Sequence, residues 1–172
     1  ITKPILILGS IFPDEAADLV RHDLATILCT PNLAQALAKE AEKQGKIVNV
    51  HIKVDTGMNR LGVLPENLLS LIKTISTLPN LKLEALSTHF SSADDEDTSI
   101  TTQQIELFQK TLSELQNAGV TMPPFTHMAN TSALFRFPES RSKIVRPGLI
   151  LYGALPSPVL NSVVQEVCQK EN

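Results

Sequence analysis

Strand-like and helix-like segments alternate along most of the chain, and this alternation restricts the fold more than any other feature. Six short apolar segments have the length and composition of buried strands: residues 5–9, 25–29, 47–56, 81–90, 125–130 and 144–150. Between them, apolar residues recur at helical spacing over residues 14–22, 31–44, 65–78, 100–118 and 131–137. Strands that alternate with helices form a parallel sheet, so the sequence predicts an α/β protein.

Two arrangements of such a sheet have to be weighed, an open doubly wound sheet and a (β/α)8 barrel. No glycine-rich phosphate loop follows the first strand, which weakens the dinucleotide-binding type of open sheet. A complete (β/α)8 barrel usually takes about 250 residues, whereas this chain has 172 and starts at Ile1 rather than Met. We therefore expect a partial (β/α)8 TIM barrel with about six βα units, a fragment of a longer protein.

Composition excludes several classes of function. Apolar residues make up 42% of the chain and charged residues 19%, which excludes a disordered or fibrous chain. The net charge of -3 gives no electrostatic reason to bind nucleic acid or an anionic membrane. Cys29 and Cys168 lie far apart and form no CxxC motif, which predicts a reduced, cytoplasmic setting without a bound metal.

The third predicted strand carries polar residues at every second position. Asn49, His51, Lys53 and Asp55 share one face of residues 47–56, and the other face is apolar. Parallel strands covered by helices are usually buried on both faces, so the polar side chains would point into a barrel lumen, where they must be hydrogen-bonded or functional. The alternative is an edge strand with one face in water.

Polar side chains also follow the carboxyl ends of successive strands, where barrel enzymes carry their active sites. The residues concerned are Arg60, His89, His127, Asn130 and Arg146. Each alone could be structural, but together they would converge on one anionic, planar or polar ligand. The acidic run at residues 94–97 matches no metal-binding spacing and is interpreted as a solvated loop.

Four motifs, taken together, resemble the alanine racemases. They are HIKVDTGMNRLGV at residues 51–63, STHFSSADDED at 87–97, HMANTSALFRFP at 127–138 and VRPGLILYG at 145–153. The resemblance implies a pyridoxal-phosphate enzyme with an N-terminal barrel and a C-terminal β-domain. Residues 1–155 would be the barrel portion, with family strands three to eight, and residues 156–172 the linker and the start of the second domain.

The resemblance also implies an activity and a setting. The complete enzyme would be a cytoplasmic homodimer that interconverts L-alanine and D-alanine and supplies D-alanine for peptidoglycan. Two other readings stay open. One is a different barrel-type pyridoxal-phosphate enzyme, such as a D-amino-acid dehydratase or aldolase or a broad-specificity racemase. The other is a non-catalytic pyridoxal-phosphate homeostasis protein.

Individual roles follow from the same resemblance. Arg60 matches the arginine that contacts the substrate carboxylate and the phenolic oxygen of the cofactor. Lys53 matches a lysine that many members carry as a carbamate, whose negative charge orients that arginine. Arg146 matches the arginine that faces the pyridine nitrogen, and an arginine pKa above about 12 would keep it from protonating that nitrogen. His89 and His127 match histidines that hold Arg146.

The phosphate end of the cofactor is assigned in the same way. Asn130 and Thr131 resemble an Asn-Ser pair near the cofactor, with Thr131 as a hydroxyl donor to the phosphate. Gly148 and Leu149 would donate backbone N–H groups to it. Asn59 stands where many members have Gly, a departure expected to change only the local turn.

Both catalytic bases of the family are missing from this sequence. The Schiff-base lysine belongs to a Lys-x-Asn-Ala-Tyr-Gly-like motif, which the chain lacks, and the opposing tyrosine belongs to the C-terminal domain. Tyr152, the one tyrosine present, lies in the LYG motif. We therefore expect this chain alone to be inactive.

Overall fold

The structure, a computed structural model, describes residues 2–170 and divides into two compact units. The first unit takes in the chain up to residue 55, residues 59–87 and residues 121–124. The second takes in residues 56–58, residues 88–120 and the chain from residue 125 onward.

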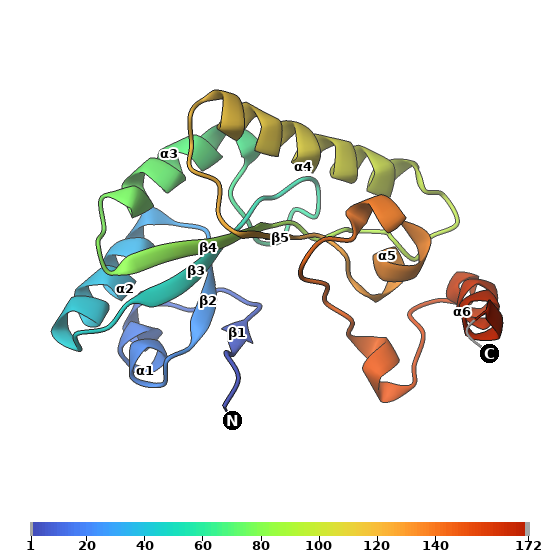
Figure 1. The fold of residues 1–172 in the computed structure, drawn as a ribbon, viewed down its shortest axis with the longest axis horizontal. Helices are drawn as coiled ribbons and strands as arrows, with labels where there is room; N and C mark the ends of the chain where they lie inside the picture. The colour runs from blue at the N-terminus through green and yellow to red at the C-terminus, as the bar shows by residue number, and fades with distance from the viewer. Residues whose placement is uncertain (1, 171–172) are drawn as a thin grey trace. The chain divides into compact units, whose positions relative to one another are not determined.

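The first unit contains four parallel strands in chain order (Figure 1). They are β1 (Leu6–Ile7), β2 (Ala25–Leu28), β3 (Val48–Lys53) and β4 (Leu81–Ser87). Ile27 pairs with His51, and Lys53 pairs with Ser87. Parallel strands that follow one another in chain order are what a (β/α)8 barrel requires, as the alternation in the sequence predicts.

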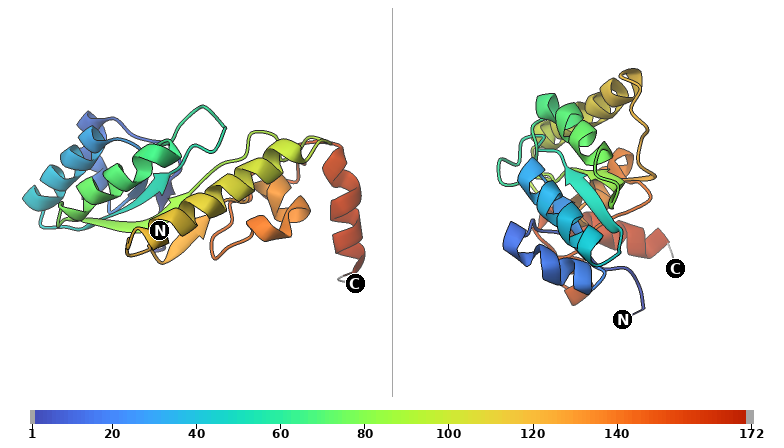
Figure 2. Two further views of the ribbon diagram at one scale, coloured as in Figure 1. Left: turned by 90° about the horizontal axis from the view of Figure 1, so that it is seen from above. Right: turned by 90° about the vertical axis from the view of Figure 1, so that its left-hand side faces the viewer.

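Helices connect these strands and cover them. They are α1 (Ala16–Arg21), which follows a short 3-10 helix (Pro13–Glu15), α2 (Pro31–Lys43) and α3 (Pro65–Ser76). The side chain of Thr30 caps α2 by accepting a hydrogen bond from the Leu33 N–H at 3.3 Å. Figure 2 shows α2 alongside β3. α2 contacts both β3 and β4. Leu37 from α2 and Ile52 from β3 are fully buried in this core.

β3 is an interior strand, and two side chains of its polar face are buried. It pairs with β2 on one side and β4 on the other, and the exposed fractions of His51 and Lys53 are 3% and 7%. Asn49 and Asp55, at the two ends of the predicted strand, are half-buried. His51 Nε2 lies 3.0 Å from Glu84 Oε2 on β4. The edge-strand alternative is therefore wrong.

The second unit holds the remaining elements that the structure describes. They are α4 (Ser99–Asn117), β5 (Phe125–His127), α5 (Thr131–Arg136), 3-10 helices over Pro138–Ser140 and Leu149–Tyr152, and α6 (Val159–Lys170). Within it, Thr88, the residue after β4, donates its N–H to the His127 carbonyl at 3.2 Å. α6 lies where the sequence analysis placed a linker and assigned no secondary structure. The side chain of Cys168 is outside the described residues.

The sixth predicted strand, residues 144–150, is wrong. Only one parallel bridge forms, between Asn130 and Arg146, where the Arg146 N–H donates to the Ala129 carbonyl at 2.9 Å. Pro147 has no N–H to continue the ladder. Gly148 (φ -117°, ψ -95°) then turns the chain into the 3-10 helix Leu149–Tyr152.

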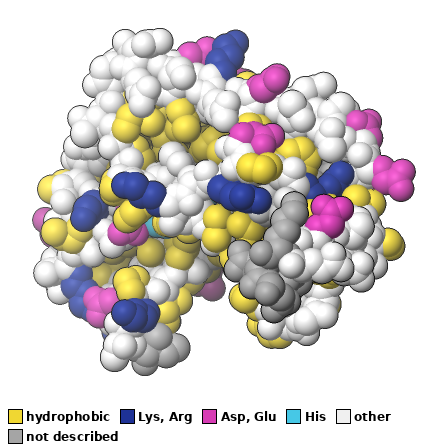
Figure 3. Space-filling model, turned by 45° about the vertical axis from the view of Figure 1, so that its right-hand side comes forward, with side chains coloured by type: hydrophobic (Ala, Val, Ile, Leu, Met, Phe, Trp, Pro, Cys, Tyr) yellow, Lys and Arg dark blue, Asp and Glu magenta, His cyan; other side chains and the backbone are white. Residues whose placement is uncertain are grey.

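The described surface mixes charges of both signs. Figure 3 shows Lys and Arg side chains interspersed with Asp and Glu on the face it presents. Within residues 2–170, no helix combines the length and the apolar character needed to cross a membrane.

Candidate functional site

Arg146 is the best-anchored charged side chain of the second unit. One guanidinium nitrogen, Nη1, contacts Nδ1 of His127. The other, Nη2, donates to the carbonyls of Thr88 at 2.7 Å and Met128 at 2.9 Å, and lies 3.4 Å from Nδ1 of His89. The structure therefore brings together three of the side chains that the sequence places at separate strand ends.

The contact at Nη1 fixes the tautomer of one imidazole. A guanidinium only donates hydrogen bonds, so His127 accepts at Nδ1 and carries its proton at Nε2. The two N–H groups of Nη2 are both used by the carbonyls of Thr88 and Met128, so the 3.4 Å contact with His89 does not set the tautomer of that ring. Burial lowers the pKa of Arg146 to about 10, well below the ordinary arginine pKa expected from the sequence, because desolvation disfavours the cation. The side chain is still cationic at neutral pH.

Thr131 and Gly148 form a second contact in the same unit. The Gly148 N–H donates to Thr131 Oγ1 at 2.8 Å, so in this structure that N–H is bound within the chain. Because Oγ1 accepts this bond, the hydroxyl proton of Thr131 is directed elsewhere. Leu149 is half exposed, at 52%, and opens the 3-10 helix, where backbone N–H groups have no acceptor in their own turn.

This donor set fits a phosphate group. A hydroxyl and the N–H groups at the start of a helical turn supply the hydrogen bonds that phosphate oxygens accept. Asn130 also caps α5, because its Oδ1 accepts from the Ala133 N–H at 3.0 Å.

Lys53 and Arg60 belong to the first unit. The loop after β3 folds back on the strand: the Val63 N–H donates to the Lys53 carbonyl at 2.8 Å, and the Asp55 N–H to the Val63 carbonyl at 2.9 Å. Gly62 has φ +145°, and a Cβ there would lie 2.8 Å from the Asp55 nitrogen, so only glycine fits. Arg60 is exposed in this loop.

Asn59 shows why its departure from glycine is tolerated. Its φ is +54°, in the left-handed region where Asn is enriched several-fold over other non-glycine residues. Its N–H donates to Asp55 Oδ1 at 3.1 Å. The turn that glycine would make is thus kept.

Cys29, next to Lys53 in the first unit, was not assigned a role from the sequence. Burial raises the pKa of the Cys29 thiol to about 11, while the Lys53 ammonium and a backbone hydrogen bond with Lys53 act in the opposite direction. Asp55 adds to the increase. The thiol therefore reports on the charge of Lys53.

Sequence reasoning also missed a buried polar network in the second unit. Thr56 Oγ1 lies 2.7 Å from Thr88 Oγ1, and Gln104 Nε2 donates to Thr56 Oγ1 at 3.4 Å. The sequence signal that could have revealed this network is Gln104, a polar residue next to the buried Ile105 in a predicted helix.

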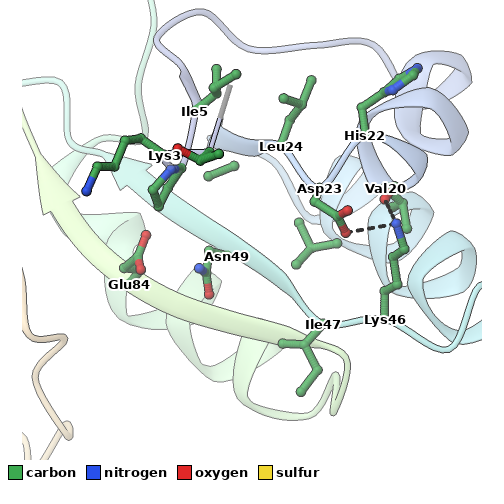
Figure 4. Close-up of a pocket in the computed structure, with 14 residues that line it drawn as sticks. Lys3, Ile5, Val20, His22, Asp23, Leu24, Lys46, Ile47, Asn49 and Glu84 are labelled. Carbon is green, nitrogen blue, oxygen red and sulfur yellow. Dashed lines mark hydrogen bonds and ion pairs between the residues drawn. The ribbon is translucent and has the colours of Figure 1, made fainter.

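A pocket of about 470 Å³ lies in the first unit, at the amino ends of the strands (Figure 4). Asn49 and Glu84 line it, as do Lys3, His22 and Lys46. Lys46 is engaged, because its Nζ donates to the carbonyls of Val20 at 3.0 Å and Arg21 at 2.9 Å and pairs with Asp23 at 2.8 Å. Barrel proteins carry conserved stability residues at this end and catalytic residues at the other, so the pocket is the weaker candidate.

Comparison with known proteins agrees with the fold and the motifs. The chain is 40% identical over 162 residues to the alanine racemase of Methanococcus maripaludis, a match that covers 94% of this chain and 43% of that protein. A solved structure of Clostridium difficile alanine racemase in complex with cycloserine superimposes with a TM-score of 0.87 at 32% identity, over 92% of this chain and 44% of that one.

A solved histidine racemase from Leuconostoc mesenteroides gives a TM-score of 0.81 at 29% identity, over 90% of this chain and 41% of that one. The chain thus spans less than half the length of these relatives. The family described as alanine racemase, N-terminal domain, matches residues 1–156. With its parallel strands in barrel order and its motifs in the expected places, this chain belongs to the alanine racemase N-terminal domain family.

Proposed function

We propose that this chain is the cofactor-binding barrel portion of a pyridoxal-phosphate-dependent racemase that interconverts L-alanine and D-alanine. The observation that carries the proposal is the Arg146 cluster, a half-buried cation held by the imidazole of His127 and two carbonyls, with the imidazole of His89 beside it. Such a group is suited to a weakly basic ring nitrogen. A structural ion pair would instead show a carboxylate partner.

The chemistry that pyridoxal phosphate supplies is acidification of the Cα–H of an amino acid joined to it. Arg146, with a pKa of about 10, would donate a hydrogen bond to the ring nitrogen and keep its proton. His127 accepts from the guanidinium, as do the carbonyls of Thr88 and Met128, and these contacts fix its orientation. Withholding that proton favours simple proton exchange at Cα over slower side reactions.

The remaining residues would bind the two anionic ends of the reactants. The exposed guanidinium of Arg60 can form paired, charge-assisted hydrogen bonds with a substrate carboxylate. A carbamate on Lys53 would give Arg60 an anionic partner. The Thr131 hydroxyl and the Leu149 N–H would hold the phosphate, with Gly148 shaping the turn.

The wider setting belongs to the same proposal. Residues 1–155 would form the barrel portion and residues 156–172 the connection to a second domain. The complete enzyme would be a cytoplasmic homodimer that supplies D-alanine for the cell wall. The two bases that move the proton would come from outside this sequence, which lacks the lysine motif and has one tyrosine, Tyr152.

A chimera tests the activity. Residues 1–156 would replace the matching stretch of the Methanococcus maripaludis enzyme, which is 40% identical. We expect the chimera to form D-alanine from L-alanine, with the unaltered relative as positive control. A chimera that folds and binds pyridoxal phosphate, yet leaves L-alanine unchanged, would contradict the proposal.

The likeness to a histidine racemase supports one second candidate, a racemase of different specificity. The same chimera decides between them when it is offered L-histidine at matched concentration. Faster turnover of L-histidine than of L-alanine would favour this candidate.

A further inference from the structure

Gln104 is a buried amide whose hydrogen bonds are all made within the second unit. Only 2% of the residue is exposed. Oε1 accepts from the backbone N–H of Ser91 at 3.0 Å and from the Ser91 hydroxyl at 3.2 Å. Nε2 donates to the His89 carbonyl at 3.2 Å and to Thr56 Oγ1 at 3.4 Å.

These partners fix which way the amide points. The Ser91 N–H can only donate and the His89 carbonyl can only accept, so Oε1 must face the former and Nε2 the latter. Both donors and both acceptor positions of the amide are therefore used. Burying an amide is costly unless it is hydrogen-bonded, and this one is fully satisfied.

The segment that Gln104 holds is the segment that holds Arg146. Thr88 accepts from the guanidinium at its carbonyl, and His89 Nδ1 lies 3.4 Å from the same guanidinium nitrogen. Gln104 binds the same two residues from the other side, directly at the His89 carbonyl and through Thr56 at the Thr88 hydroxyl.

We propose that Gln104 is a positioning residue, which fixes the Thr88–His89 segment from helix α4 and thereby sets the orientation of Arg146 toward its ligand. The inference rests on the proposed function for what that ligand is. The positioning itself is a property of the chain without any cofactor. It also gives a reason for a buried amide beside Ile105 and Phe108, where leucine or methionine would otherwise suffice for packing.

Two substitutions separate positioning from packing. Gln104→Met keeps the length and the apolar contacts but removes all four hydrogen bonds. Gln104→Glu keeps the shape, but its carboxylate cannot donate to the His89 carbonyl. Gln103→Met, at an exposed position of the same helix, is the matched control. Thr56→Val removes the hydrogen bonds of the Thr56 hydroxyl with Gln104 and Thr88 but keeps the bonds of Gln104 to Ser91 and His89, so it is the milder variant.

The measurement is made on the 172-residue chain, labelled with nitrogen-15. Ring-nitrogen shifts report the tautomer of His89, and hydrogen exchange of the Arg146 side chain reports its anchoring. In Gln104→Met and Gln104→Glu we expect the ring-nitrogen shifts of His89 to change and the Arg146 exchange rate to rise about tenfold or more, the loss of roughly one hydrogen bond. Thr56→Val should give a smaller change of the same kind, and Gln103→Met none.

Thermal unfolding of each variant identifies a purely structural effect. If Gln104→Met unfolds at a lower temperature while the His89 and Arg146 signals stay as in the parent chain, the proposal is overturned. If Gln104→Met does not fold, Thr56→Val decides, and unchanged Arg146 exchange there overturns the proposal. Because these readouts need no cofactor, an inactive chimera would remove the proposed function without affecting this result.

Discussion

The side chains of Arg60 and Arg146 differ in burial and in the number of their hydrogen-bond partners. Arg146 is partly buried and contacts two carbonyls and two imidazoles, whereas Arg60 is exposed in the loop after β3. Removing Arg146 would leave several buried acceptors without a donor, which is costly for folding. Removing Arg60 leaves no buried acceptor without a donor. Its substitution therefore tests function with little change in the stability of the fold.

We expect Arg60→Ala in the active chimera to lower kcat/KM by about two to four orders of magnitude. The reason is the loss of two charge-assisted hydrogen bonds to the substrate, roughly 1.5–3 kcal/mol each. The free energy of unfolding should change by less than about 0.5 kcal/mol, as for other exposed sites. Racemisation assays and urea unfolding measure the two quantities. Near-normal turnover, or a collapse of stability, would remove Arg60 from the proposed site.

Cys29 provides a second prediction, because its pKa of about 11 depends on the charge of Lys53. In a Cys168→Ser background, we expect iodoacetamide to alkylate Cys29 about a hundredfold more slowly at pH 8 than a thiol of ordinary pKa 9.0. Lys53→Met removes a charge that lowers this pKa, so alkylation should slow further. Saturating bicarbonate should slow it in the parent chain if Lys53 becomes a carbamate, and should have no effect in Lys53→Met.

The same thiol makes stability depend on alkaline pH. The unfolded chain would lose the Cys29 proton near pH 9 and the folded chain near pH 11, so the unfolded state binds fewer protons between these values. The contribution to stability is therefore complete below pH 9 and is lost as the pH rises to 11. A Cys29→Ala variant should lack this part of the pH dependence of urea unfolding. An alkylation rate equal to that of a free thiol would contradict the raised pKa.

At the scale of elements, the sequence predicted helices and strands well where apolar residues recur at a regular spacing. The apolar spacing predicted α2 and α3 and the alternation predicted β3, each to within a few residues. The strand predicted over residues 144–150 does not form. Its ladder stops at Arg146, because Pro147 has no N–H and Gly148 turns the chain. Apolar character alone does not separate a strand from a 3-10 turn.

The candidate site was predictable only in part, for a related reason. The side chains at the strand ends were visible in the sequence because barrel topology gathers them. The carbonyls of Thr88 and Met128 that hold Arg146 leave no trace in residue type. Gln104 left a trace, a polar residue on an apolar helix face, but its partners are distant in sequence.

The cap of α5 yields a prediction at this scale. Asn130→Ala removes the acceptor for the Ala133 N–H and should lower the free energy of unfolding by about 0.5–2 kcal/mol. Asn130→Asp and Asn130→Ser keep an acceptor and should stay close to the parent. Urea unfolding measures all three, with Thr30→Ala at the α2 cap as the matched control. Equal stability of the Ala and Ser variants would show that the cap contributes nothing measurable.

At the scale of the whole molecule, the proposed function divides the chemistry between this chain and residues outside it. The chain matches 43% of the length of the Methanococcus maripaludis enzyme and carries groups suited to holding a cofactor and a carboxylate. It has no lysine motif of the kind that joins the family's cofactor covalently. Binding of the cofactor and its covalent attachment to a lysine should therefore be separable by experiment.

We expect the chain alone to bind pyridoxal phosphate without stoichiometric attachment to a lysine. Lys53, at the end of β3, is buried and 7% exposed, and a role as anionic partner of Arg60 excludes it as the attachment point. The chain would be incubated with pyridoxal phosphate, reduced with borohydride and digested, and the labelled peptides identified by mass spectrometry. The chimera, treated in parallel, should carry one label on a lysine contributed by the Methanococcus maripaludis portion. Full labelling of one lysine in the chain alone, Lys53 in particular, would reverse the assignment and make that residue the attachment point.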